Sequence, residues 1–174
     1  MNPCKCGFFP DLGKCRCTPT QIRRYLNRVS GPFLDRIDIG VEVPRQDLGM
    51  LASEKSIDEG SFPQTEQRNS SAVMRARVME ARARQEKRFA DESISYNSQM
   101  TRRQIEKYCR LSGEDVVFLE KVERQQGISA RGHGKILKVA RTLADLDGQA
   151  EIGRTQLAEA IGCRSFEKKY WGSL

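Results

Sequence analysis

The stretch MNPCKCGFFPDLGKCRC, residues 1–17, holds four of the six cysteines of this 174-residue chain. Cys4 and Cys6 form one Cys-x-Cys pair, Cys15 and Cys17 form a second, and eight residues separate the pairs. The stretch has few core-forming side chains, so a bound metal ion would explain how it holds a shape. Because no helix or strand is predicted ahead of it, we expect the chain to start inside a larger unit.

The chemistry of these cysteines depends on the redox compartment. The sequence has no signal peptide and no apolar stretch of about 18 residues, so we expect a cytoplasmic protein outside the membrane. In a reducing cytosol, paired cysteines are more often metal ligands than disulfides. Four thiolates satisfy tetrahedral zinc, and Lys5, Lys14 and Arg16 would offset their charge. Because the one-residue spacing is tighter than usual, a metal-free loop with free thiols and a disulfide-linked loop remain alternatives.

Composition leaves the partner open. Thirty Lys and Arg against 23 Asp and Glu give a net charge of +7, which permits phosphate-rich partners without demanding them. Aromatic residues make up 7%, a low share for a protein that stacks on bases. The single histidine, His133, is predicted to lie on the surface or in packing, and Cys109 and Cys163 to be packing residues.

Residues 1–44 are predicted to form the first unit. Thr18 is the expected N-cap of a helix with Pro19 at its first position and Gln21 completing a capping box. Apolar side chains then alternate with polar ones from Ile37 to Val43, which predicts a strand that Pro44 ends.

The remaining chain is predicted to be helical after a linker. Residues 45–70 have linker composition, rich in Asp, Glu, Ser, Gln, Asn and Gly. Residues 71–165 are expected to form a helical domain, and 166–174 an exposed tail. The predicted N-caps of its helices are Ser70, Thr101, Ser112, Ser129 and Thr155.

Two arginines occupy unusual places. Arg131 follows the Ser129 cap, where a cation opposes the helix dipole unless an anion such as a phosphate lies at the helix start. The glycines at 132 and 134 would cost that helix about 2 kcal/mol. Arg36 lies between Asp35 and Asp38, where it could form an ion pair or act as an arginine finger on a transferring phosphoryl group.

Several motifs together resemble one family, the magnesium-chelatase-like AAA+ ATPases of the competence-associated branch. The similarity covers residues 1–44 and roughly 70–165, in order. It rests on NPCKCG at 2–7, SGPFLDRID at 30–38, VEVP at 41–44 and the segment from ISAR at 128–131 to Leu146.

This resemblance implies a fold and a set of roles. The fold would be mainly α with a small α/β remnant, namely the end of an AAA+ core with a cysteine knuckle, followed by a C-terminal helical lid. Asn2 matches the sensor 1 residue, Arg36 the arginine finger acting on a neighbouring subunit, and Arg131 the sensor 2 arginine. The complete protein would bind ATP and Mg²⁺, form a homo-oligomeric ring, expected to be hexameric, and act on DNA as a branch-migration helicase.

The chain lacks part of what that activity needs. It contains no G-x-x-x-x-G-K-[ST] loop and no apolar strand ending in acidic residues, so we expect no ATP hydrolysis by this chain alone. Two alternatives stay open. The chain could be a zinc-stabilised nucleic-acid-binding module that uses the basic helix around residues 75–88, or an inactive gene fragment.

Overall fold

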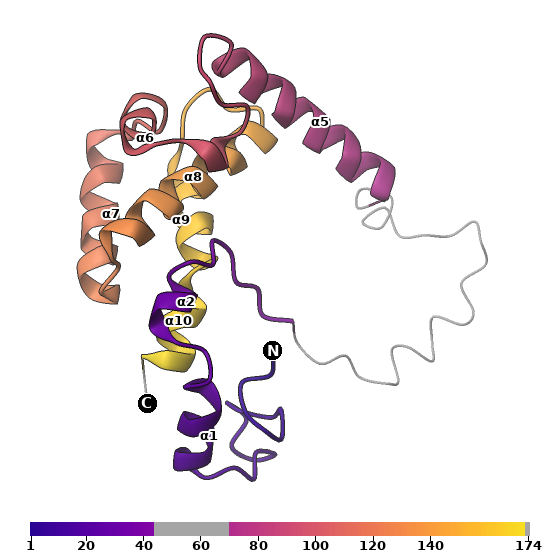
Figure 1. Ribbon diagram of the computed structural model, residues 1–174, viewed down its shortest axis with the longest axis vertical. Coiled ribbons are helices and arrows are strands. Elements are labelled where there is room, and N and C mark those ends of the chain that lie inside the picture. Colours follow the sequence, from indigo (N-terminus) through magenta and orange to yellow (C-terminus); the bar gives the residue numbers. More distant parts are fainter. Residues whose placement is uncertain (44–69, 173–174) are drawn as a thin grey trace, which may run out of the picture.

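The computed structural model describes residues 1–43 and 70–172, and every regular element in these residues is helical (Figure 1). The mainly helical prediction is therefore confirmed. The predicted linker at 45–70 falls outside the described residues except for Ser70. The elements are α1 Pro19–Leu26, α2 Gly31–Leu34, α5 Ser71–Arg88, η2 Asn97–Gln99, α6 Arg102–Tyr108, α7 Gly113–Gln126, α8 Ala130–Leu146, α9 Arg154–Gly162 and α10 Ser165–Trp171.

The first helix begins as the sequence predicts. The Thr18 side chain accepts from the Gln21 backbone N–H at 3.3 Å, and the Gln21 side chain accepts from the Thr18 N–H at 3.0 Å, which completes the capping box. Ile22 and Leu26 are the buried side chains of α1 and face the cysteine loops. This contact gives the N-terminal segment a small core of its own.

The strand expected from Ile37 to Val43 does not form among the described residues. The segment is extended, but a strand needs a neighbouring strand to pair its backbone groups, and the described residues supply none. Its backbone hydrogen bonds run instead from the Ile37 N–H to the Leu34 carbonyl at 2.9 Å and from the Gly40 N–H to the Cys163 carbonyl at 2.8 Å. Val41 and Val43 are 76% and 85% exposed as a result.

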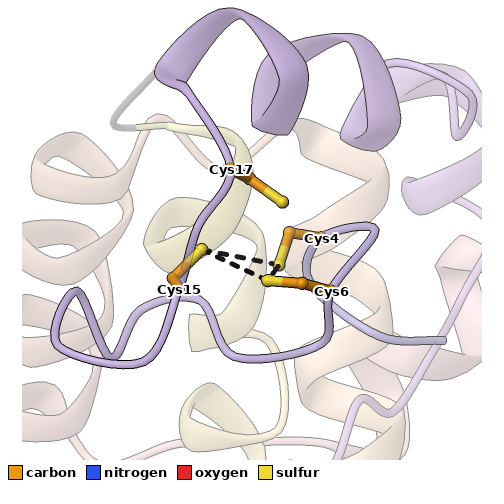
Figure 2. Close-up of side chains that lie close together, drawn as sticks. All are labelled: Cys4, Cys6, Cys15 and Cys17. Carbon is orange, nitrogen blue, oxygen red and sulfur yellow. Dashed lines mark hydrogen bonds between the residues drawn. The ribbon is translucent and has the colours of Figure 1, made fainter.

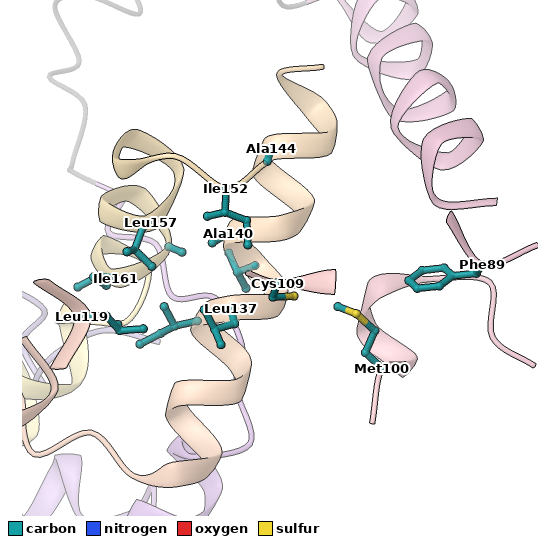
Figure 3. Close-up of a cluster of buried hydrophobic side chains, with 13 residues drawn as sticks. Phe89, Met100, Cys109, Leu119, Leu137, Ala140, Ala144, Ile152, Leu157 and Ile161 are labelled. Carbon is teal, nitrogen blue, oxygen red and sulfur yellow. The ribbon is translucent and has the colours of Figure 1, made fainter. Parts of the chain in front are cut away.

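Helices α5 to α9 pack around one apolar core, which Figure 3 shows in close-up. Helix α8 lies at its centre and contacts α5, α6, η2 and α9. Three of the predicted caps, Ser70, Ser112 and Ser129, accept from backbone N–H groups of their helices. The fully or nearly fully buried core residues are Phe89, Met100, Cys109, Leu119, Ile136, Leu137, Val139, Ala140, Ala144, Ile152, Leu157, Ala160 and Ile161.

Two details of this bundle differ from the sequence expectation. Helix α9 is capped at Gly153 rather than Thr155, because the Gln156 side chain reaches back to the Gly153 N–H at 3.1 Å. The two glycines near the start of α8 do not break the helix. A Cβ on Gly132 would lie 2.7 Å from Cγ2 of Ile128, so the close approach of that side chain requires glycine there.

The C-terminal segment forms helix α10 and is not the exposed tail that the sequence predicted. Tyr170 and Trp171 pack against the core formed by the cysteine loops and α1. The Trp171 indole N–H donates to the Leu26 carbonyl at 3.1 Å, and Tyr170 meets Phe9 edge to face at 6.2 Å. Aromatic burial therefore fixes the end of the chain to its beginning. Among the described residues, no helix is both long and apolar enough to cross a membrane.

Candidate metal centre and arginine sites

The first cysteine pair lies on a tight turn. The Gly7 N–H donates to the Cys4 carbonyl at 3.1 Å, and Gly7 has φ +79°, a left-handed conformation that favours glycine. The chain then turns back so that the Phe9 N–H donates to the Cys4 sulfur at 3.4 Å. Cys4 is fully buried, whereas Cys6 is partly exposed.

A second turn brings the other pair to the same place. The Cys15 N–H donates to the Asp11 carbonyl at 2.8 Å, and the Asp11 carboxylate accepts from the Gly13 N–H at 3.1 Å. Cys17 follows and directly precedes Thr18, the cap of α1. Both pairs are thus positioned by backbone turns rather than by regular elements.

The four sulfurs converge on one point, as Figure 2 shows. All lie within 4.8 Å of one another. The Cys4 sulfur is 3.4 Å from that of Cys6 and 3.8 Å from that of Cys15, and the Cys6 and Cys15 sulfurs are 3.6 Å apart. Sulfurs bound to one tetrahedral zinc ion at about 2.3 Å would be about 3.8 Å apart. The donor set and its spacing therefore fit a zinc ion.

The local electrostatics explain why a cation suits this cluster. The Phe8 backbone N–H is the largest influence on Cys6 and, with other hydrogen bonds, lowers the pKa of that thiol to about 6. The Cys17 N–H lowers the pKa of Cys15, but burial and the adjacent Cys6 and Cys4 sulfurs outweigh it and raise this pKa to about 12. One thiolate thus suppresses ionisation of its neighbour, and a bound metal cation would remove that conflict.

Helix α8 begins against a carboxylate of the N-terminal unit. The Ser129 hydroxyl accepts from the Gly132 N–H at 3.1 Å and donates to the Asp35 carboxylate at 3.1 Å. Asp35 also lies 3.8 Å from the guanidinium of Arg164, which is 4% exposed and donates to the Ile37 carbonyl at 2.7 Å. The sequence indicated an anion at this helix start, and in the structure Asp35 supplies one.

The three residues singled out from the resemblance are all exposed. Arg131 is at the second position of α8. Arg36 does not pair with its neighbours in sequence, since Asp35 binds Ser129 and Asp38 lies 2.7 Å from Lys135. Instead its Nη1 donates to the Pro32 carbonyl at 2.6 Å.

Asp35 and Ser129 join the segments that carry Arg36 and Arg131, whereas Asn2 lies separately in the exposed N-terminal stretch. Sequence reasoning did not identify Asp35 as the partner of Ser129 and of Arg164. The bonds that join them cross more than 90 residues of chain and have no periodic signal.

Cys109 and His133 lie where the sequence predicted. Cys109 lies in the core of the helical unit, where burial raises the pKa of its thiol to about 11. His133 is half-buried, and its Nδ1 lies 2.7 Å from a carboxylate oxygen of Glu123.

Comparison with known families places this geometry in context. Residues 68–164, more than half of the chain, match the family described as magnesium chelatase, subunit ChlI C-terminal, and residues 1–51 match the family described as magnesium chelatase, subunit ChlI. The chain belongs to the magnesium chelatase subunit ChlI family. In this family context the α5–α9 bundle corresponds to the C-terminal match, and the cysteine unit with α1 and α2 falls within the other match.

Individual relatives span both matches. The chain is 39% identical to the competence protein ComM of Haemophilus influenzae over 165 residues, which covers 95% of this chain and 30% of ComM. It is 39% identical over 168 residues to the uncharacterised protein YifB of Escherichia coli, covering 97% of this chain and 30% of YifB. An uncharacterised protein of Mycobacterium tuberculosis is 30% identical over 163 residues. The chain therefore spans about a third of the length of these relatives.

Proposed function

We propose that this chain is the C-terminal part of a magnesium-chelatase-like AAA+ ATPase and supplies residues that act on ATP in a ring of subunits. Arg36 is the arginine finger, Arg131 the sensor 2 arginine and Asn2 the sensor 1 residue. The observation that carries this proposal is the Asp35–Ser129 hydrogen bond of 3.1 Å, which holds the Arg36 and Arg131 segments together. Arg36 directly follows Asp35, Arg131 lies two residues after Ser129, and both arginine side chains are exposed.

The physical role of each arginine follows from its charge and exposure. A guanidinium keeps its charge at all physiological pH values and presents a planar array of donors that matches phosphate oxygens. An arginine finger stabilises the charge that spreads over the transferring phosphoryl group. The β- and γ-phosphates and Mg²⁺ are then held by the rest of the complete ATPase. Because ComM is named for competence, we propose DNA as the polymer that ATP hydrolysis remodels.

The cysteine cluster has a structural role in this proposal. A zinc ion bound by Cys4, Cys6, Cys15 and Cys17 fixes the two loops that lead into α1. The sulfur spacing of 3.4–3.8 Å supports this assignment. With all four positions filled by thiolates, the zinc has no open position for a substrate, so it stabilises the fold rather than catalysing a reaction.

ATP hydrolysis by the complete ATPase tests the arginine roles. Arg36→Ala and Arg131→Ala should each lower the turnover rate by about a thousandfold or more, the range lost when an arginine finger is removed. Arg102→Ala is the matched control, because Arg102 is also exposed but lies on α6, where its partner is Glu106. Size-exclusion chromatography should show unchanged assembly. Hydrolysis at the wild-type rate by either variant would refute the assignment.

The alternative, a free-standing nucleic-acid-binding module that uses the basic helix α5, has less support. Arg88 binds Asp145, Arg84 donates to the Asp145 carbonyl at 2.9 Å, and Arg77 lies 4.0 Å from Asp147. These arginines fasten α5 to α8 and its C-terminal loop instead of facing an outside partner.

A further inference from the structure

The positive charge of the chain is concentrated at its beginning. Residues 1–28 contain six Lys and Arg and a single acidic residue, Asp11, whereas the other 146 residues are nearly balanced, with 24 basic and 22 acidic side chains. A zinc ion bound by four thiolates would add a formal charge of −2, and residues 1–28 would still be positive. The basic side chains are Lys5, Lys14, Arg16, Arg23, Arg24 and Arg28, and all six are exposed.

These cations have few partners within the described part of the chain. Lys14 lies 3.8 Å from Asp11, and both side chains are more than half exposed. The Arg28 guanidinium lies over the Tyr25 ring, 5.6 Å from its centroid. This contrasts with Arg77, Arg84 and Arg88 of α5, which are engaged with Asp145 and Asp147. Exposed, unneutralised cations are the groups that bind phosphates by displacing counterions.

Two clefts lie among these cations. One, of about 230 Å³, is lined by Arg23, Leu26 and Asn27 of the α1 region together with Tyr170 and Trp171 of α10. The other, of about 480 Å³, is lined by residues of the cysteine loops, including Lys14 and Arg16. A cleft that combines a cation with aromatic rings suits an unpaired base next to its phosphate, because bases stack on aromatic side chains.

We propose that the cysteine loops and α1 form a binding surface for single-stranded nucleic acid, with the strand's phosphates on the six cations and a base in the Arg23–Trp171 cleft. We call this the knuckle–α1 surface. The inference rests on the proposed function only in taking DNA as the polymer. It assigns the contact to residues 1–28 and α10 rather than to α5. A zinc ion bound by the four cysteines would then also set the spacing of Lys5, Lys14 and Arg16.

Fluorescence anisotropy tests this surface by measuring how a labelled thymidine strand of about 16 nucleotides binds to the 174-residue chain. The salt dependence of affinity reports the number of phosphates contacted, with a slope of about −0.7 per phosphate for a single strand. The Arg23→Gln/Arg24→Gln variant should therefore lower the slope by about 1.4. When salt rises from roughly 50 to 200 mM, the fold-loss of affinity should be about seven times smaller for this variant than for the wild type.

Two control pairs remove the same charge elsewhere. Arg102→Gln/Arg103→Gln changes two adjacent exposed arginines on α6, and Arg75→Gln/Arg82→Gln changes two exposed arginines on α5. Both should keep the wild-type slope. An equal loss of slope in the α5 or α6 pair, or an unchanged slope in the α1 pair, would overturn the proposal.

The chain's one tryptophan gives an independent signal. The thymidine strand should quench Trp171 emission, whereas a duplex of the same length should bind more weakly and leave it unchanged. Unaltered emission at saturating single strand, or tighter binding of duplex, would refute the single-strand assignment. Since no ATP is present, the result is independent of whether Arg36 and Arg131 act in hydrolysis.

Discussion

Asp145 holds the helical unit together, and its replacement gives the sharpest test of how that unit is stabilised. Its side chain is fully buried in α8. It accepts from Arg88 of α5 with both carboxylate oxygens, from the Asn97 amide at 2.8 Å, and lies 3.1 Å from Arg141 Nη2. The pairs join α5 and η2 to the central helix.

Asp145→Asn keeps the shape of the side chain and removes its charge. The amide has one acceptor oxygen, so at least one of the surrounding donors must face its NH₂ group. Arg141, whose side chain is 3% exposed and whose pKa burial lowers, would lose the carboxylate that compensates its charge. Removing one partner of a buried ion pair costs about 3–5 kcal/mol. For a unit of this size, that cost lowers the melting temperature by about 10 °C or more.

Urea and thermal unfolding followed by far-ultraviolet circular dichroism measure this loss. Asp91→Asn is the matched control, because Asp91 is exposed and its replacement should change the free energy of unfolding by less than about 0.5 kcal/mol. If Asp145→Asn also stays within about 0.5 kcal/mol of the wild type, the buried pairs do not stabilise the unit as described.

Three further measurements check other parts of the structure. Chain purified without chelator should contain about one zinc ion and have its four N-terminal thiols protected. Chelation should change Trp171 emission, because Trp171 packs on the cysteine core. No metal and four freely reactive thiols would contradict the zinc site. Hydrogen bonds from Tyr108, Lys107 and Gln104 lower the pKa of Glu92 to about 2, so its stabilisation is present above the unfolded pKa of about 4.5 and is lost as pH falls toward 2. Glu92→Gln should therefore flatten the acid limb of the pH–stability curve, and an unchanged limb would argue against these bonds. Gly127 ends α7 with φ +68°, so Gly127→Ala should lower the free energy of unfolding in urea by about 1 kcal/mol. The control, Gly113→Ala, should not destabilise the chain, because an added Cβ at Gly113 meets nothing within 4 Å. Equal effects of the two replacements would count against the left-handed cap.

Local signals in the sequence determined the helices and the cysteine cluster. A capping box such as Thr18–Gln21 involves residues three apart, and the amphipathic pattern of α8 repeats within single turns, so both are readable without tertiary information. The four N-terminal cysteines were predicted as one cluster because only backbone turns separate them. The structure brings all four sulfurs within 4.8 Å of one another.

Contacts between distant segments were decided by the tertiary structure. The alternation from Ile37 to Val43 predicted a strand, but alternation gives only the sidedness of a strand and cannot supply the neighbour that pairs with it. Nothing in the composition of α10 showed that Tyr170 and Trp171 would find an apolar site on the cysteine core, about 150 residues earlier in the chain. The hydrogen bond between Asp35 and Ser129 likewise joins residues 94 positions apart in the sequence. Sequence patterns report what neighbouring residues favour, whereas these contacts depend on which surfaces the folded units present to each other.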